Sequence, residues 1–448
     1  MKSLKITQCL LAVAGILTTA PLMAQDLPKL NVQRLKLKNG LTVLALEDHT
    51  VPSIAFYTLY KVGARNERPG ITGLSHLFEH MMFNGSARFK PKMFDRLVEA
   101  GGGYSNAFTT SDTTEYFEEV SSATLDTVLQ LESDRMRSLK IDSQNLEQER
   151  GIVKEERRVN TDNTIPGSMY EVLWNHAFVA HPYRWDTIGF MKDLNAIQVP
   201  DARSYFKTYY APNNAVVVVV GDFQTKTLFA GMHRYFEDIP AQTPPAKVIN
   251  AEPPQQGEKR IQYHRPADLP AIHFGYKIGT NRDADDPALD LLSTILSNGD
   301  SSRLYKSLIY DQQIANEVSA SNESRIDPGL FSFYAQASPG QTAEACEQAI
   351  LKIIEEVKTN GVTERELRKA KNVRLNAVIS RFSTNLGRAG LLAGFEAHWG
   401  NWNQIYQSTP KYEKVTLADI QRVAKKYFQE RTRTVVVLRP EKPEGAGQ

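Results

Sequence analysis

An internal repeat is the feature that most limits what this chain can fold into. The segment PAIHFGYKIG, from Pro270, has the same pattern as PSIAFYTLYKVG, from Pro52. Further along, LLSTILSNGDSSRL corresponds to HLFEHMMFNGSAR, and DIQRVAKKYFQERTRTVVVLRP corresponds to the unit from YFKTYY to VVVVV. Strand and helix patterns therefore follow each other in the same order twice. The repeat predicts an α+β protein of two homologous domains, each with a mixed or antiparallel β-sheet faced by helices.

Chain length and local composition indicate the domain boundaries. The 448 residues exceed what a single hydrophobic core usually holds. Residues 240–258 concentrate proline and glutamine and have no periodicity, which is typical of a linker. We therefore expect an N-terminal domain over 25–239, this linker, and a C-terminal domain over 259–439. Residues 440–448 are expected to form a disordered tail.

The first 24 residues are typical of a cleavable secretory signal peptide. Lys2 and Lys5 precede the apolar run 9–16, and the segment ends in small residues at Ala24. The apolar run is shorter than the roughly 20 residues of a membrane span, and no other stretch reaches that length. We therefore expect export to the periplasm without a membrane span after cleavage, although the sequence does not distinguish the periplasm from secretion beyond it.

The charge of the mature chain argues against nucleic-acid binding. Without the two leader lysines, the 53 basic residues fall to 51, which equals the 51 acidic residues. A nucleic-acid-binding domain usually carries a clear excess of lysine and arginine on one face. We expect no nucleic-acid partner.

One segment, GLSHLFEHMMFNG, carries a candidate metal site. His76, Glu79 and His80 fall on one face of a predicted helix, because positions i, i+3 and i+4 lie within about one turn. Two imidazoles one turn apart can bind one Zn²⁺, and the nearby carboxylate can accept a proton from the attacking water. The order H-x-x-E-H inverts the commoner H-E-x-x-H motif. Taken alone, a core helix that packs through Leu77 and Phe78 explains the segment about as well.

A hydrolytic zinc site needs a third protein ligand, and the segment SQNLEQERGIVKEERRVN offers three candidates, Glu149, Glu155 and Glu156. It is predicted to form a helix with Asp142 or Ser143 as its N-cap. Glu149 and Glu156 lie seven residues apart and so share a face, whereas Glu155 points about 100° away. The alternative interpretation is a solvated helix face rich in charge.

The two segments together resemble a known family. HLFEH followed, 76 residues after His80, by the second glutamate of ERGIVKEE is similar to the pitrilysin and insulinase family of zinc peptidases, particularly its mitochondrial processing peptidase branch. The resemblance covers nearly all of the mature chain. It implies one zinc ion per chain, bound by His76, His80 and Glu156. Glu79 would be the general base, and Glu149 would orient a ligand histidine.

The family pairs an active N-terminal domain with a degenerate C-terminal copy, and the two domains form half of a clamshell chamber. When Asn298 and Gly299 are aligned with the Asn-Gly pair that follows HLFEHMMF, Asp290, Ser293 and Thr294 take the positions of the metal motif. None of these three is a histidine. The second copy is therefore expected to keep the scaffold without a metal site.

A third segment, GGGYSNAFTTSDTTEYFEE, resembles the strand on which this family binds substrate. By that match Asn106, Ala107 and Phe108 lie along an extended peptide that adds to the sheet edge. Such backbone pairing depends little on the side chains of the bound peptide. The alternative is an ordinary hairpin whose edge is covered by another element.

One departure from the family predicts a partner. The family uses an Arg and Tyr pair from a C-terminal domain to contact substrate, and the matched positions here are Ile309 and Asn316. The side chain of isoleucine has no hydrogen-bond donor to replace the arginine, and that of asparagine has no phenol group to replace the tyrosine. We therefore expect a heterodimer with a homologous subunit that supplies the pair; a homodimer would leave the same two residues in place and should be feeble.

The expected function is that of a zinc-dependent endopeptidase that hydrolyses extended or unfolded peptides inside a dimeric chamber. A non-catalytic peptide-binding or scaffold subunit is the competing interpretation, because relatives with degenerate sites exist. Such proteins lose metal ligands first, and here the motif and both distal glutamates are present. A zinc enzyme for small amides is disfavoured by the strand-like peptide platform. His181, in HPYRWDTIGF, is expected to lie in a packed loop away from the metal.

Overall fold

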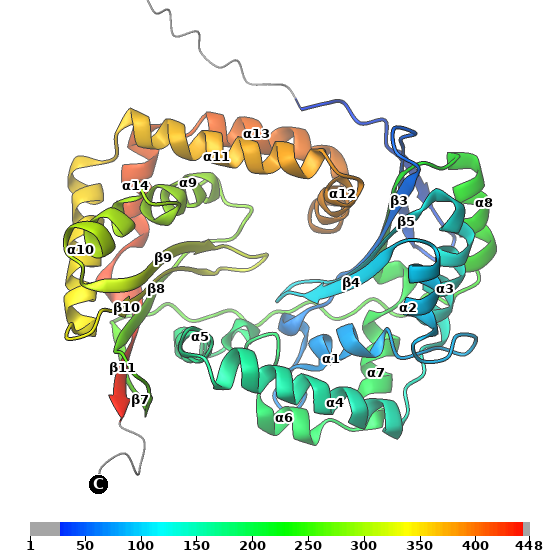
Figure 1. Ribbon diagram of the computed structural model, residues 1–448, viewed down its shortest axis with the longest axis horizontal. Coiled ribbons are helices and arrows are strands. Elements are labelled where there is room, and N and C mark those ends of the chain that lie inside the picture. Colours follow the sequence, from blue (N-terminus) through cyan, green and yellow to red (C-terminus); the bar gives the residue numbers. More distant parts are fainter. Residues whose placement is uncertain (1–26, 442–448) are drawn as a thin grey trace, which may run out of the picture. The chain divides into compact units, whose positions relative to one another are not determined.

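The computed structural model describes residues 27–441, so the predicted signal peptide and most of the predicted tail lie outside the described residues. From Asn31 on, the described residues belong to one compact unit, which holds all the helices and strands given below (Figure 1). Within the described part of the chain, no helix is both long enough and apolar enough to cross a membrane.

The first half of the chain builds a six-stranded sheet. β2 and β6 are parallel, and all other neighbouring strands are antiparallel. β6 is buried along its whole length, as its run of five valines requires. β4 is the last strand and forms one edge. In spatial order the strands are β1 (Gln33–Lys36), β2 (Thr42–Glu47), β6 (Ala215–Gly221), β3 (Ser53–Tyr60), β5 (Thr114–Ser121) and β4 (Tyr104–Thr109).

The second half builds a five-stranded sheet with the same order. β7 and β11 are parallel, and the remaining neighbours are antiparallel, as in the series from β2 to β4. The repeat seen in the sequence is therefore a repeat of strand order and direction, and the prediction of an α+β fold with two such sheets is confirmed. The strands are, in spatial order, β7 (Lys259–Pro266), β11 (Arg433–Glu441), β8 (Ala271–Lys277), β10 (Leu330–Ala337) and β9 (Ala315–Glu323).

Helices face both sheets (Figure 1). Those of the first half are α1 (Leu74–Met81), α2 (Met93–Ala100), α3 (Leu125–Ser138), α4 (Ser143–Arg157), α5 (Ile165–Ala177), α6 (Met191–Ala196), α7 (Val199–Tyr209) and α8 (Thr225–Phe236). Those of the second half are α9 (Asp286–Ser297), α10 (Ala343–Asn360), α11 (Glu364–Phe382), α12 (Asn385–Trp399), α13 (Ile405–Glu413) and α14 (Leu417–Tyr427).

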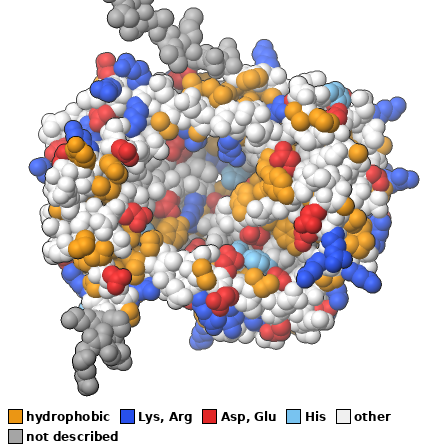
Figure 2. Space-filling model, viewed as in Figure 1, with side chains coloured by type: hydrophobic (Ala, Val, Ile, Leu, Met, Phe, Trp, Pro, Cys, Tyr) orange, Lys and Arg blue, Asp and Glu red, His pale blue; other side chains and the backbone are white. Residues whose placement is uncertain are grey.

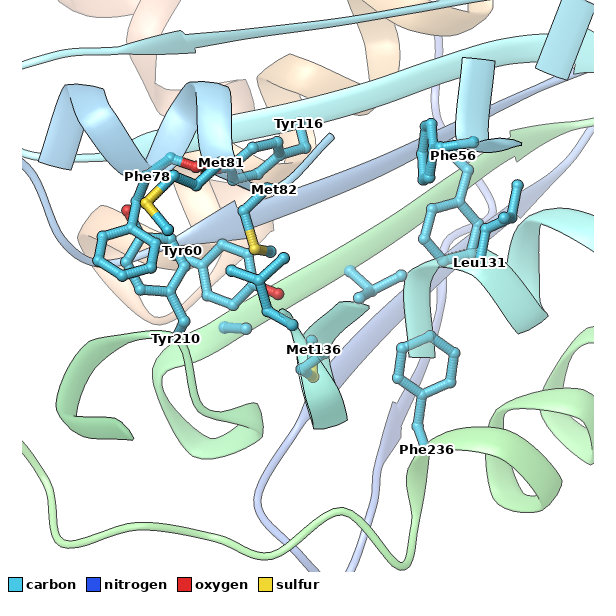
Figure 3. Close-up of a cluster of buried hydrophobic side chains, with 14 of the residues drawn as sticks. Phe56, Tyr60, Phe78, Met81, Met82, Tyr116, Leu131, Met136, Tyr210 and Phe236 are labelled. Atoms are coloured by element: carbon cyan, nitrogen blue, oxygen red, sulfur yellow. Dashed lines mark hydrogen bonds between the residues drawn. The ribbon is translucent and has the colours of Figure 1, made fainter. Parts of the chain in front are cut away.

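The packing of α1 explains why its polar face is free for chemistry. Phe78 and Met81 are fully buried and cluster with Tyr60, Tyr116 and Tyr210 (Figure 3). The rings of Phe78 and Tyr210 have centroids 4.9 Å apart. Burying each such side chain stabilises the fold by roughly 1.5–3 kcal/mol. One face of α1 is thus fixed to the core, and the opposite arc presents the histidine motif.

The two halves exchange helices. α5, from the first half, packs on β8 and β11 of the second sheet through Met169 and Leu173. Conversely α12, from the second half, packs on β3 and β6 of the first sheet. Arg34 near the N-terminus pairs with Glu396 of α12 at 2.9 Å, which strengthens the second contact. Residues 240–258 contain no helix or strand, yet each sheet is covered in part by a helix from the other side of that segment.

The prediction of a disordered tail over residues 440–448 is wrong for its first two residues. β11 continues through Pro440 and Glu441, which pair with Arg265 and Pro266 of β7. On the other side of β11 the pairing with β8 already ends at Leu438. Pro440 therefore lies where the strand has only one neighbour, a position in which a missing N–H is tolerated.

Candidate metal centre

A buried carboxyl group from outside α1 holds the start of this helix. Gly73 precedes the helix with φ of +86° and offers no side-chain cap. Instead, the N–H groups of Gly73 and Ser75 donate to Glu67 at 2.8 and 2.7 Å. Burial raises the pKa of Glu67 to about 8, against the opposing effect of these backbone donors. Glu67 thus satisfies two of the donors that a helix N-terminus leaves unpaired.

The N-terminus of α4 is capped as the sequence predicts. Asp142 is its N-cap, and its carboxylate accepts the N–H of Asn145 at 2.9 Å. α4 packs against α1, and the shared face of Glu149 and Glu156 points toward the histidines. Glu155 points elsewhere, is largely exposed, and pairs with Arg158.

The structure brings the predicted ligand atoms together. Glu156 Oε1 lies 3.6 Å from His76 Nε2, and Glu156 Oε2 lies 3.2 Å from His80 Nε2. One ligand atom from each of these three residues lies within 4.8 Å of the others. The two imidazole rings are nearly perpendicular, with centroids 4.9 Å apart. Among residues 27–441, this is the one group of three such side chains close enough to bind a single metal ion.

These distances suit zinc. With bonds of about 2.0–2.1 Å in a tetrahedral arrangement, two ligand atoms are about 3.3–3.4 Å apart. The separations from Glu156 to the two histidines, each made by a different oxygen of the carboxylate, fall on either side of that value. The other nitrogen of His80, Nδ1, lies 3.6 Å from Glu149 Oε2, which is the usual relation between a ligand histidine and an orienting carboxylate. The donor set and its surroundings therefore fit a zinc ion.

The electrostatics of the three side chains are those of a cation site. Burial lowers the pKa of His76 to about 4, so its imidazole is neutral, as a metal ligand must be. Burial also lowers the pKa of His80, but the neighbouring carboxylates of Glu149 and Glu156 outweigh this effect and raise the pKa to about 9. The neighbouring imidazole of His80 in turn lowers the pKa of Glu156. The carboxylates favour positive charge at this point, from a proton or from a metal ion.

Glu79 lies beside the ligand group and outside it. Its Oε2 is 3.9 Å from His76 Nε2 and accepts a hydrogen bond from Thr109 Oγ1 at 2.7 Å. Burial raises the pKa of Glu79, and the hydrogen bond from Thr109 opposes this effect. A partly buried carboxylate held in one orientation next to the metal position has the geometry of a general base.

The predicted peptide strand is an edge of the sheet. Asn106, Ala107 and Phe108 are consecutive in β4, which pairs only with β5 among the described strands. Phe108 is 41% exposed. The next residue, Thr109, is the donor to Glu79, so the edge strand and the candidate base are directly connected.

Several contacts of the site come from residues that the sequence interpretation missed. Thr109 lies inside the predicted substrate strand, but its hydroxyl could not be linked to Glu79 without the register of β4. Asn84, just after α1, donates to Glu149 Oε1. The position of Asn84 shortly after the HLFEH motif was the one feature of the sequence that could have indicated this contact.

The HPYRWDTIGF loop connects the two helices that carry the ligands. Arg157, next to Glu156, donates to the carbonyl of Gly189 and forms an ion pair with Glu171. Gly189 lies against Gly73 so closely that a Cβ on Gly189 would be 2.3 Å from the nitrogen of Gly73. The loop therefore ties the end of α4 to the start of α1.

His181 and the matched positions of the second copy have partners of their own. His181 Nε2 lies 3.0 Å from Asp327, outside the metal cluster. In α9, Asp290 accepts a hydrogen bond from Tyr412, and the hydroxyls of Ser293 and Thr294 donate to the carbonyl of Asp290. The matched positions of the second copy therefore have ordinary structural contacts.

Known proteins resemble this chain along nearly its whole length. Residues 42–187 match the family model described as Insulinase (Peptidase family M16), and residues 196–374 match the one described as Peptidase M16 inactive domain. Zinc protease PqqE of Helicobacter pylori is 34% identical over 413 residues, covering 90% of this chain and 92% of that protein.

Two further relatives agree. The uncharacterized zinc protease YmxG of Bacillus subtilis is 26% identical over 79% of this chain and 85% of its own length. The crystal structure of a protease from Helicobacter pylori superposes with a TM-score of 0.88 at 33% identity, covering 92% of this chain and 100% of that one. With this identity and coverage, and with both family models matched in order, the chain belongs to the insulinase (M16) family of peptidases.

Proposed function

We propose that this protein is a zinc-dependent endopeptidase that cuts extended or unfolded peptides. The observation that carries the proposal is the convergence of His76, His80 and Glu156 from two helices, with Glu79 beside them. The zinc protease names of the relatives support the same class of activity. One zinc ion per chain would be bound by these three side chains.

Each residue of the site has a defined task in this proposal. When bound, zinc would supply a Lewis acid that polarises the scissile carbonyl and lowers the pKa of the attacking water to about 7. Glu79 Oε2 accepts a proton from that water and returns it to the departing amine. Glu149 orients the imidazole of His80, and Thr109 holds the carboxylate of Glu79.

The edge of β4 is the proposed peptide platform. An extended peptide that pairs with Asn106, Ala107 and Phe108 would run past Thr109 and so past the base. Backbone hydrogen bonds from a sheet edge bind peptides with little regard to side chains. This mode suits unfolded segments and excludes folded domains.

The proposed working form is a heterodimer. At the positions where the family has an Arg and Tyr pair, Ile309 is partly buried against the second core, and Asn316 accepts a hydrogen bond from Ser338. Neither side chain can replace the pair. A second, homologous subunit would supply it and close the chamber around the peptide.

Location and domain roles follow the sequence. We assign residues 1–24 as a signal peptide for export to the periplasm, residues 25–239 as the catalytic domain and residues 259–441 as a degenerate copy. Residues 240–258 connect them.

Cleavage with and without a chelator tests the proposal. The purified chain, alone and together with a homologous subunit encoded nearby, is incubated with an unfolded protein such as reduced casein. Cleavage is expected to stop with 1,10-phenanthroline and to return with added Zn²⁺. A protein that binds casein but never cleaves it, with or without the second subunit, would instead be a peptide-binding subunit.

A further inference from the structure

The turn that joins β4 to β5, residues 110–113, is held by the turn of the second copy that joins β9 to β10. Arg325 donates to Ser111 Oγ at 2.6 Å, and the N–H of Ile326 donates to Asp112 Oδ2 at 3.2 Å. In Figure 1 the ends of these two hairpins face each other in the middle of the view, and Figure 2 shows that this face is hollowed there. The two halves of the chain therefore meet at the tip of the hairpin that carries the proposed peptide platform.

Asp112 is the centre of this contact. Its side chain is 9% exposed, and its Oδ1 accepts a hydrogen bond from the phenol of Tyr183 at 2.7 Å. The guanidinium of Arg65 lies 3.6 Å from the same oxygen and also pairs with Asp327 of the second copy. The N–H of Asp327 donates to the Tyr183 oxygen at 3.2 Å. Both oxygens of the Asp112 carboxylate are thus engaged, and both are connected to the turn of the second copy.

Other side chains hold Arg325 in one orientation. Its guanidinium carbon lies 3.8 Å from the centroid of the Trp174 ring, and it donates to the phenol of Tyr170 at 2.7 Å. Tyr170 in turn donates to Glu323 of β9 at 3.0 Å. A planar guanidinium that is both stacked and hydrogen-bonded has little freedom left. The bond from Arg325 to Ser111 therefore fixes the position of the β4–β5 turn.

The first half of the chain supports the same turn through its backbone. The N–H of Ala64 donates to the carbonyl of Thr110 at 3.3 Å. The N–H of Arg65 donates to the carbonyl of Ser111 at 2.9 Å. Gly63 permits this close approach, because a Cβ on Gly63 would lie 2.4 Å from the Thr110 carbonyl oxygen. The turn therefore has backbone contacts to its own half and is held by Arg325 and by the carboxylate of Asp112 to the second copy.

The end of β4 that is held in this way is the end nearest the candidate base. Thr109, the donor to Glu79, is the last residue of β4 and directly precedes the turn. Among the described strands β4 pairs only with β5, so no second strand fixes its outer edge. A shift of the turn would move the platform and the hydroxyl that holds the Glu79 carboxylate. Misplacing a reacting group by about 1 Å can cost about 100-fold in rate.

We propose that the degenerate copy positions the peptide platform, with Asp112 and Arg325 as the positioning residues. Neither side chain touches the bond that is cut, and both act on Thr109 through the β4–β5 turn. The inference rests on the proposed function, because it concerns the strand along which the peptide is proposed to bind. It gives the second copy a task in the catalytic domain: it holds the hairpin in the position in which an extended peptide can pair with β4.

Hydrogen exchange measured by mass spectrometry tests the positioning without any cleavage. Asp112→Ala and Arg325→Met should each raise the amide exchange rate of residues 107–116 by about tenfold, because the turn then opens locally more often. Asp112→Asn keeps one oxygen as an acceptor and should be intermediate. Glu119→Ala is the matched control, because Glu119 accepts a hydrogen bond from Tyr104 at the opposite end of the same hairpin. It should leave the exchange of residues 107–116 at the parental rate.

Peptide affinity and zinc content distinguish positioning from a general loss of structure. Binding of fluorescein-labelled reduced casein to the inactive variant Glu79→Gln is measured by fluorescence anisotropy. Adding Asp112→Ala should raise the Kd about tenfold, because a platform that must first be ordered binds less tightly. The zinc content should stay at the value of Glu79→Gln alone. Adding Glu119→Ala should change the Kd by less than about twofold.

Two results would overturn the proposal, with circular dichroism establishing that each variant is folded. One is parental exchange of residues 107–116, or parental casein affinity, in both Asp112→Ala and Arg325→Met. The other is a loss of zinc in parallel with the loss of affinity, because the contact would then hold the whole domain and not the platform. Failure of the proposed function looks different: a chain that shows the predicted exchange and binding but never cleaves, even with its partner, keeps the positioning role and loses the peptidase assignment.

Discussion

Glu155 and Glu156 are neighbours in the chain, yet the structure gives them opposite surroundings. The 100° step of the helix turns Glu156 toward His76 and His80 and leaves Glu155 in solvent with Arg158. Spacing alone could therefore predict which face of α4 lies toward the two histidines. It could not select Thr109, because that contact depends on how β4 lies over α1.

The three candidate glutamates of α4, Glu149, Glu155 and Glu156, should differ in zinc retention. Glu156→Ala should lose the metal, because it removes one of three ligands. Glu149→Ala should weaken zinc binding by about 10–100-fold, the usual cost of losing a carboxylate that orients a ligand histidine. Glu155→Ala is the matched control and should bind zinc as the parent does. Metal analysis after dialysis against a weak chelator decides the matter, and equal retention in Glu155→Ala and Glu156→Ala would refute the assignment.

At the scale of single elements, the sequence predicts most of what carries the site. Its patterns indicate the helix that carries the two histidines, the helix capped at Asp142 and the strand that contains Asn106, Ala107 and Phe108. The sequence indicates less clearly which contacts hold each element in place. Glu67 lies six residues before Gly73 and has no helical relation to it, so its role at the start of α1 appears only when the loop is folded.

Removing Glu67 should loosen α1. Glu67→Ala leaves two buried N–H groups unpaired, which costs about 1–3 kcal/mol for each buried group left unsatisfied. Glu67→Gln retains one acceptor and should be intermediate. We expect zinc affinity to fall in the same order, because both ligand histidines lie on this helix. Thermal unfolding and zinc titration of the two variants check it; a Glu67→Ala protein with parental melting temperature and zinc affinity would show that α1 needs no such cap.

A buried cluster of charged side chains holds a second helix, α3, in place. Arg135 of α3 pairs with Glu132 and lies 3.1 Å from Glu118, with all three side chains almost fully buried. Arg135→Met leaves the carboxylates without their cation and should lower the free energy of unfolding by about 3–5 kcal/mol. Arg137→Met, on the same helix but at the surface, should change it by less than about 0.5 kcal/mol. Urea unfolding of both variants measures the difference, and similar values would contradict the argument.

For the molecule as a whole, the repeat predicted two sheets of the same strand order, and the structure confirms them. It did not predict that α5 and α12 cross over to the opposite sheets. Hydrophobic periodicity indicates that a helix has an apolar face but not which sheet covers that face. The same limit applies to the end of β11, where the neighbouring strand decides how far the pairing continues.

The partner prediction also belongs to this scale. If Ile309 and Asn316 leave the chain without a substrate-binding pair, the purified protein alone should cleave casein at least about tenfold more slowly than a mixture with its homologous subunit. Size-exclusion chromatography with light scattering and cleavage assays on the two preparations test it. Full activity from a monomer or homodimer, without any second polypeptide, would exclude the heterodimer.

The account depends most on the assignment of Glu79 as the base beside a zinc ion that it does not bind. The direct test is to measure zinc content and casein cleavage together for Glu79→Gln, with His80→Ala as the comparison. We predict that Glu79→Gln retains one zinc per chain while its cleavage rate falls by about 10²–10⁴-fold, and that His80→Ala loses both. A Glu79→Gln protein that keeps its zinc and still cleaves at the parental rate would contradict the mechanism.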